Sequence, residues 1–140
     1  MNQNDLEHLA EDTALSLRPG DNIFITGDLG AGKSVFARAV LRKLGVTGNI
    51  PSPSFIIDAV YYAGNKEIHH IDLYRLEGDN RELESLGVFE TLDSCSLAVV
   101  EWADRLDEDI LSNGILINIR FTDDPLQREV VVDDQRMARN

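Results

Sequence analysis

The spacing of apolar residues in the first third of the chain predicts a helix, a strand and a second helix. A proline and a glycine at 19–20 separate the first helix from an apolar run at 22–26, which is typical of a short buried strand. A second amphipathic pattern predicts a helix over residues 33–44, ended by Gly45. The residues that predict the first helix recur at helical spacing: Leu6, Leu9, Ala10, Ala14 and Leu17.

The rest of the chain predicts a β-hairpin, two short helices and further strands. Residues 55–62 and 67–72 are rich in β-branched and aromatic side chains and flank a turn signal, which indicates a hairpin. The continuous apolar run at 96–100 is typical of a strand buried on both faces. The pattern as a whole predicts an α/β fold, and its remaining parts are two short helices within 81–92, strands at 115–121 and 129–132, and frayed termini at 1–4 and 133–140.

Length and composition place these elements in one soluble domain. The 140 residues suit a single domain, and 43% hydrophobic residues suffice for a core. No stretch is long and apolar enough for a membrane span, and residues 1–5 do not resemble a secretory signal. The only cysteine, Cys95, cannot form an internal disulfide, so we expect a reducing, cytoplasmic setting.

The charge of the chain argues against unaided binding to nucleic acid. Thirteen Lys and Arg residues face 25 Asp and Glu residues, which gives a net charge of −12. Proteins that grip RNA or DNA by themselves usually neutralise phosphates with clustered basic residues. We therefore expect no autonomous tRNA binding, although a role within a nucleic-acid pathway stays open.

The strongest chemical signal is a phosphate-binding loop at residues 27–34. Its sequence, Gly-Asp-Leu-Gly-Ala-Gly-Lys-Ser, matches the pattern G-x-x-x-x-G-K-[ST] at every fixed position, between a predicted strand and a predicted helix. Glycines let the backbone approach a phosphate closely, and the helix N-terminus provides N–H groups for an anion. Lys33 is expected to place its charge on the terminal phosphates from an exposed position, and the Ser34 hydroxyl to complete a Mg²⁺ shell.

Two carboxylates are candidates for the second half of such a site. P-loop enzymes place a carboxylate at the end of a neighbouring buried strand, where it holds Mg²⁺ or orients water. Glu101 directly follows the run at 96–100, and Asp72 ends the second strand of the hairpin. Trp102, the only tryptophan, is a possible neighbour of the site. The GTPase signatures D-x-x-G and N-K-x-D are absent from the sequence, which favours ATP.

Several ordered strings together resemble the TsaE family, whose members are small P-loop ATPases of tRNA threonylcarbamoyladenosine biosynthesis. The strings are residues 27–34, Ser-Pro-Ser-Phe at 52–55, His-Ile-Asp-Leu-Tyr-Arg-Leu at 70–76, Glu-Leu-x-x-Leu-Gly at 82–87 and Val-Glu-Trp at 100–102. The resemblance implies a three-layer α/β P-loop domain with a mixed, partly antiparallel sheet. It also implies weak Mg²⁺-dependent ATP hydrolysis, activated by the protein partners TsaB and TsaD, in a protein that is monomeric when isolated.

The resemblance also implies roles for particular residues. Ser34 and Glu101 would be the Mg²⁺ ligands, with Lys33 and Asp72 acting beside them, Asp72 at the metal or the attacking water. The segment Ser52, Pro53 and Ser54 would be a nucleotide-sensing switch. The residues that would contact phosphates are Leu29, Gly30, Ala31, Gly32, Lys33 and Ser34.

Two other functions are compatible with the phosphate loop. The first is a small-molecule kinase, although the chain shows no segment that would serve as an arginine-bearing lid. The second is a nucleotide sensor that does not hydrolyse ATP. The presence of Lys33, Ser34, Asp72 and Glu101 favours hydrolysis over sensing.

Overall fold

Six strands form one mixed sheet in the order β2-β3-β4-β1-β5-β6. A computed structural model describes residues 1–28, 30–50, 58–74, 80–94 and 96–136. The four central strands are parallel, and the edge strands β2 and β6 are antiparallel to their neighbours. In chain order the strands are β1 (Asn22–Gly27), β2 (Asp58–Ala63), β3 (Lys66–Asp72), β4 (Leu97–Glu101), β5 (Ile115–Phe121) and β6 (Arg128–Asp134).

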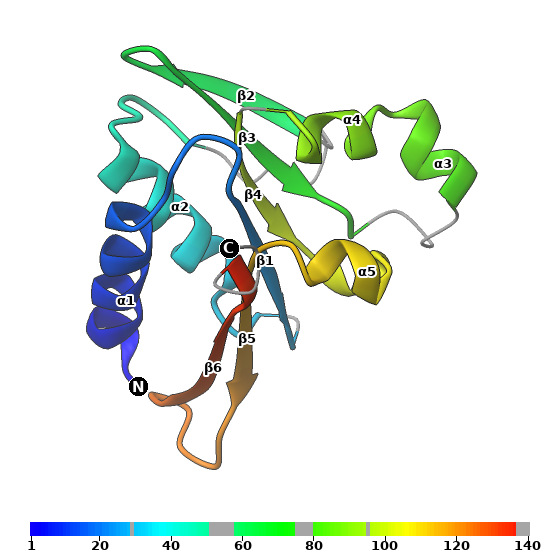
Figure 1. The fold of residues 1–140 in the computed structure, drawn as a ribbon. Helices are drawn as coiled ribbons and strands as arrows, with labels where there is room; N and C mark the ends of the chain where they lie inside the picture. Colours follow the sequence, from blue (N-terminus) through cyan, green and yellow to red (C-terminus); the bar gives the residue numbers. More distant parts are fainter. Residues whose placement is uncertain (29, 51–57, 75–79, 95, 137–140) are drawn as a thin grey trace.

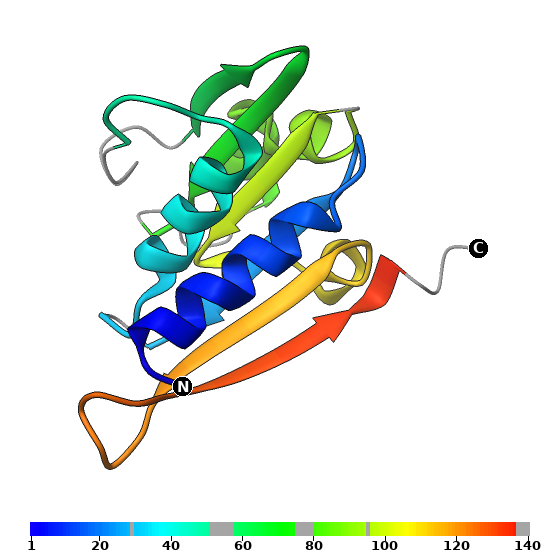
Figure 2. The same cartoon turned by 90° about the vertical axis from the view of Figure 1, so that its left-hand side faces the viewer.

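Helices cover both faces of this sheet. Figure 1 shows α1 and α2 on one face and α3, α4 and α5 on the other, and Figure 2 looks onto the face that α1 and α2 cover. A separate cluster of buried apolar side chains fills each interface. The three-layer α/β fold with a mixed sheet is therefore confirmed. The helices are α1 (Gln3–Leu15), α2 (Lys33–Leu44), α3 (Asn80–Ser85), α4 (Val88–Leu92), η2 (Ala103–Arg105) and α5 (Glu108–Leu111).

Strand alternation decides which polar side chains reach the α2 face. On β4, Val99 belongs to the apolar cluster beneath α1 and α2, whereas Val100 belongs to the opposite cluster. Side chains two residues apart on a strand share a face, so Glu101 lies on the same face as Val99. By the same alternation, His70 and Asp72 of β3 share the α2 face with Ile68, which belongs to the same cluster as Val99.

Most of the predicted elements form at the expected positions. The helix at 33–44 and the strand at 115–121 are confirmed residue for residue. The hairpin of β2 and β3 and the pair of short helices α3 and α4 are confirmed with shifted bounds, and residues 55–57 of the predicted first hairpin strand lie outside the described residues. The short helices η2 and α5, which follow β4, were not predicted because they carry too few residues for a periodic pattern. Cys95 and residues 51–57 lie outside the described residues.

The ends of the chain are more ordered than the sequence predicted. Asn2 is the N-cap of α1 and forms a capping box with Asp5, so residues 1–4 are not frayed. At the other end, β6 continues through Asp134, and Arg136 follows it into a set of ion pairs. Residues 137–140 lie outside the described residues.

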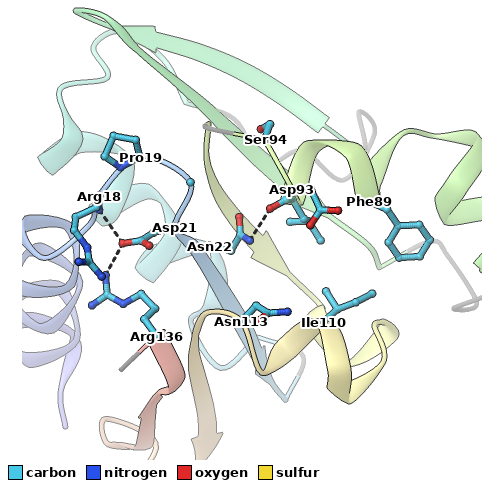
Figure 3. Close-up of a pocket in the computed structure, with 12 residues that line it drawn as sticks. Arg18, Pro19, Asp21, Asn22, Phe89, Asp93, Ser94, Ile110, Asn113 and Arg136 are labelled. Carbon is cyan, nitrogen blue, oxygen red and sulfur yellow. Dashed lines mark hydrogen bonds and ion pairs between the residues drawn. The ribbon is translucent and has the colours of Figure 1, made fainter. Parts of the chain in front are cut away.

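Arg136 joins the C-terminal segment to the beginning of β1. Its Nη1 lies 2.7 Å from Asp21 Oδ2, and both side chains are nearly buried. The backbone N–H of Arg18 donates to the same carboxylate oxygen at 2.8 Å. Figure 3 shows Asp21 between these two arginines, at the rim of a cavity at the amino end of β1. A buried carboxylate with several donors explains why the tail is held.

His69 occupies a cluster of polar side chains on the hairpin. Its Nδ1 lies 2.8 Å from Asp58 Oδ2, and its Nε2 lies 3.1 Å from Glu67 Oε2. Ser96, just before β4, donates its hydroxyl to Glu67 at 2.5 Å. Burial of the His69 ring opposes its charge, but the hydrogen bonds and charges of Asp58 and Glu67 outweigh burial and raise the pKa of His69. The charged imidazole therefore joins β2 to β3 more firmly than the neutral one.

We expect the stabilising effect of His69 to depend on pH. Because its pKa is raised in the folded protein, the contribution is fully present below the unfolded pKa of about 6.5 and is lost as pH rises through the folded pKa. His69→Gln should lower the free energy of unfolding more at pH 6 than at pH 9, measured by urea denaturation. His8→Gln, on an exposed position of α1, is the matched control and should show a small effect at both pH values. An equal loss for His69→Gln at both pH values would refute the pairing.

Candidate functional site

The phosphate loop connects the carboxyl end of β1 to the start of α2. The N-cap of α2 is Gly32, with φ +117°, and it makes no side-chain cap hydrogen bond. A helix begins with N–H groups that have no partner within the helix, and these groups suit an anion. The left-handed conformation at Gly32 and the uncapped helix start are therefore what a phosphate cradle requires.

Gly27 is required for a different reason from the one its motif suggests. A Cβ atom at this position would lie 1.9 Å from the backbone oxygen of Ile119. Gly27 pairs with Ile119 in the β1–β5 ladder, and its φ is +139°. Its lack of a side chain thus allows β5 to approach the start of the loop closely.

The loop is also bonded to the β5–β6 hairpin. The backbone N–H of Asp28 donates to Ile119 O at 3.2 Å, and the Asp28 carboxylate accepts from the N–H of Phe121 at 3.1 Å. Further along, Arg128 at the start of β6 donates its Nε–H to Ala31 O at 2.9 Å. The hairpin therefore holds the loop from both of its strands.

Lys33 is buried, in contrast to the exposed position expected from the sequence. Its side chain is 5% exposed, and Nζ donates to Gly27 O at 2.8 Å and to Asp28 O at 2.6 Å. The ammonium also lies 4.3 Å from the centre of the Trp102 ring. Burial lowers the pKa of Lys33, against the opposing charges of Glu101 and other nearby carboxylates.

The Glu101 carboxylate connects the loop helix to the sheet. Ser34 Oγ donates to Glu101 Oε1 at 2.7 Å, and His70 Nε2 lies 2.5 Å from Glu101 Oε2. Glu101 is 2% exposed and His70 is fully buried. Both oxygens of a nearly buried carboxylate are therefore occupied by polar partners. Ser34 and Glu101 are the pair that the family resemblance implies as Mg²⁺ ligands.

Asp72 ends β3 beside Glu101. The two residues are register partners in the parallel β3–β4 pair. Asp72 is 5% exposed, and its Oδ1 accepts from the backbone N–H of Tyr74 at 2.9 Å. Because parallel strands end at the same edge of a sheet, both candidate carboxylates reach the same side of the loop.

Trp102 stands beside these groups in an unusual backbone conformation. Its φ of +57° is a left-handed conformation and the only positive φ among the described non-glycine residues. Its ring lies 5.0 Å from that of Tyr74, centre to centre, and forms one side of the Lys33 environment. A bulky residue held in this region is strained, and such strain is concentrated at functional sites.

Two cavities meet over the loop. One, of about 370 Å³, contains most of the predicted site residues, and the other, of about 620 Å³, opens toward α1 and the β5–β6 turn. They share Gly30, Gly32 and Val35. The first cavity is lined by Gly30, Gly32, Lys33, Ser34, Val35, Asp72, Tyr74, Glu101 and Trp102. The second is lined in part by Asn2, Asn4, Leu6, Leu126 and Arg128.

Not every predicted site residue can be placed. Leu29 and the expected switch segment of Ser52, Pro53 and Ser54 lie outside the described residues. A further cavity of about 750 Å³, the one in Figure 3, lies at the opposite end of β1 and contains none of the predicted site residues.

Sequence reasoning did not find His70 or Tyr74 as part of the site. Adjacent strand residues face opposite sides, so His69 contacts Asp58 while His70 contacts Glu101. The signal that would have singled out His70 is its spacing, two residues before Asp72 on a buried strand and hence on the same face. Tyr74 lies beyond the end of β3, where strand alternation no longer predicts direction.

The oxygen donors of the site suit Mg²⁺ held together with a nucleotide. Ser34 and Glu101 offer a hydroxyl and a carboxylate 2.7 Å apart, and Mg²⁺ typically takes one or two such ligands plus phosphate oxygens and water. Over the described ranges, no cluster of three or more His, Cys, Asp or Glu side chains could hold a metal by itself. Phosphate oxygens of a nucleotide and water would supply the remaining ligands.

The fold and the loop together define a P-loop NTPase architecture, and comparisons with known proteins define its family. The family model described as "Threonylcarbamoyl adenosine biosynthesis protein TsaE" matches residues 1–130. The chain belongs to the TsaE family. In the described part of the chain, no helix has the length and apolar character that a membrane span requires.

Curated relatives carry the same family name. Proteins named "tRNA threonylcarbamoyladenosine biosynthesis protein TsaE" from Haemophilus influenzae and Bacillus subtilis are 35% and 33% identical to this chain. The first match covers 78% of this chain and 68% of the relative, and the second covers 93% and 80%. The crystal structure of Bacillus subtilis YdiB superposes with a TM-score of 0.75 at 28% identity, over 96% of this chain and 81% of that one.

Proposed function

We propose that this protein binds and hydrolyses ATP with Mg²⁺ as an accessory protein in threonylcarbamoyladenosine modification of tRNA. The observation that carries the ATPase part is the 2.7 Å hydrogen bond between Ser34 and Glu101. It joins the last residue of the phosphate motif to a carboxylate at the end of a neighbouring parallel strand. That pair is the arrangement in which P-loop enzymes hold the metal of a nucleotide. The pathway is proposed from the names of the relatives.

The two cavities would hold different parts of the nucleotide, its phosphates and its base. The phosphates would lie on residues 30–34, with the Lys33 ammonium moving from the loop carbonyls to the terminal phosphates. The base would occupy the cavity lined by Leu6 and Leu126, whose apolar side chains suit a flat heterocycle, while Asn2 and Asn4 offer hydrogen-bonding groups. Arg128 lies at the junction of this cavity and the loop.

The residues at the phosphate end would provide the chemistry. Bound Mg²⁺ would polarise the terminal phosphate and neutralise charge that develops during transfer. Ser34 and Glu101 would hold the ion, and Lys33 would stabilise the phosphate oxygens. Asp72, the register partner of Glu101, would act at the metal or orient the attacking water. The residues 52–54 would sense the state of the nucleotide.

TsaB and TsaD are the proposed partners, and the cytoplasm is the proposed location. The net charge of −12 suits a basic surface on another protein and opposes direct contact with RNA. ATP hydrolysis would then cycle the complex of TsaB and TsaD, while the protein by itself would be a monomer with weak activity.

Lys33→Met tests the phosphate end of the site. Methionine keeps most of the buried stem but removes the ammonium, so the fold should be retained and ATP affinity should fall by at least about 10-fold, the effect of losing one charge-assisted contact. Trp102 fluorescence reports binding because Trp102 is the only tryptophan and lies beside Lys33. Lys43→Met, at an exposed position near the end of α2, is the control. Wild-type affinity in Lys33→Met would contradict the assignment of the loop.

Glu101→Gln should reduce hydrolysis far more than binding. The loop N–H groups hold the ground-state phosphates, whereas the carboxylate acts through the metal on charge that develops in transfer. We expect turnover in the reconstituted complex with TsaB and TsaD to fall on the order of 100-fold, with ATP affinity in EDTA unchanged and ATP affinity in Mg²⁺ reduced only about 10-fold. The control is Glu108→Gln, exposed on α5. Unchanged turnover would move the metal assignment to Asp72.

The isolated protein should not bind tRNA at physiological salt. A chain with charge −12 repels a polyanion over about a Debye length, near 8 Å at physiological ionic strength. A gel-shift titration of the protein alone, beside the complex with its partners, measures this directly. Sub-micromolar binding by the protein alone, weakening steeply with salt, would reveal a basic surface and overturn the accessory role.

A further inference from the structure

His70 is a buried polar residue in an apolar part of the sheet. It is fully buried, its register partner on β4 is Val99, and Ile68 precedes it on the same face of β3. Strand positions buried on both sides usually carry apolar side chains. A histidine at this depth therefore needs an explanation beyond packing.

Among the described residues, the side chain of His70 makes its hydrogen bond to Glu101. Its Nε2 lies 2.5 Å from Glu101 Oε2, whereas its Nδ1 is buried and has no partner among the described residues. A carboxylate can only accept, so the proton of the ring is assigned to Nε2. Within the described ranges, one ring nitrogen of His70 therefore has no hydrogen bond, while the other is directed at Glu101.

This hydrogen bond determines how the Glu101 carboxylate is turned. With Oε2 held by His70, Oε1 is the oxygen that meets Ser34 Oγ at 2.7 Å. A carboxylate held at one oxygen cannot rotate freely about its last bond, so the other oxygen keeps a fixed direction. Outer partners of metal ligands commonly act in this way.

We propose that His70 is a positioning residue that fixes the Glu101 carboxylate so that Oε1, together with Ser34, is presented to the Mg²⁺ of a bound nucleotide. This inference rests on the proposed function, because it needs Glu101 to be a metal ligand. It goes beyond that function in assigning the orientation of the ligand to a residue that itself reaches neither metal nor nucleotide. His70 acts only through Glu101.

The test compares ATP binding with and without Mg²⁺ in variants of the full chain. His70→Leu keeps an apolar filling of the space but removes the donor. His70→Gln keeps a donor about as far from the backbone as Nε2. Trp102 fluorescence gives the ATP affinity in EDTA and in Mg²⁺, and thermal denaturation shows whether each variant is folded.

We expect His70→Leu to bind ATP in EDTA with wild-type affinity. The factor by which Mg²⁺ increases its ATP affinity should be smaller than that of the wild type by at least about 10-fold, the usual effect of removing such an outer partner. His70→Gln should recover most of that gain. A residue that served only packing would give the opposite order, since leucine fills an apolar core better than an amide. His69→Gln, on the opposite face of the same strand, is the control and should keep the wild-type Mg²⁺ dependence.

Each outcome decides the matter. A folded His70→Leu protein with wild-type Mg²⁺ dependence, or a folded His70→Gln protein as deficient as His70→Leu, overturns the positioning role. If His70→Leu does not fold, His70→Asn replaces it, because the shorter amide cannot reach Glu101. Equal Mg²⁺ dependence of ATP affinity in the Asn and Gln variants then overturns the positioning role. If the ATP affinity of the wild type does not increase with Mg²⁺, the proposed function fails. If it increases equally in the wild type and in the His70 variants, only the positioning role of His70 fails.

Discussion

The organisation of this molecule depends on keeping one carboxylate, that of Glu101, in a place almost without water. A charged group that is 2% exposed is unfavourable unless donors surround it. Here one donor comes from the first turn of α2 and the other from β3, so the carboxylate joins the loop helix to the strand beside its own. The arrangement works only if β3 and β4 are parallel and in the observed register, because any slip by one residue would turn Glu101 toward the opposite face.

The same register explains why the site forms at one edge of the sheet. β1, β3 and β4 run in parallel, and their carboxyl ends place the loop, Asp72 and Glu101 side by side. The remaining strands, β2, β5 and β6, contribute none of these residues and support the strands that do. β2 covers the outer edge of β3, while β5, parallel to β1, turns back through β6 to support the loop. A mixed sheet thus separates the strands that carry chemistry from those that hold them in place.

The sequence predicted the parts of this fold that carry either a long run of regularly spaced apolar residues or a fixed motif. The α2 pattern and the loop motif were sufficient for residues 27–44, and the apolar runs located the strands that end at Asp72 and Glu101. The burial of individual side chains was not predictable from the same patterns. The motif suggested an exposed Lys33, but its side chain is nearly buried and packs against the Trp102 ring. The contact of His70 with Glu101 was missed for a related reason. It depends on which strands become neighbours, and a single strand pattern carries no information on that pairing.

The attachment of the phosphate loop to the β5–β6 hairpin has an energetic consequence for ligand binding. Gly27, Asp28 and Ala31 are all held by contacts with that hairpin, which belong to the fold itself. The entropy lost in ordering these residues is therefore part of the folding reaction and is not subtracted from the affinity for a phosphate. Weakening the hairpin would lower affinity without removing a single ligand contact, by returning that entropy to the unbound loop.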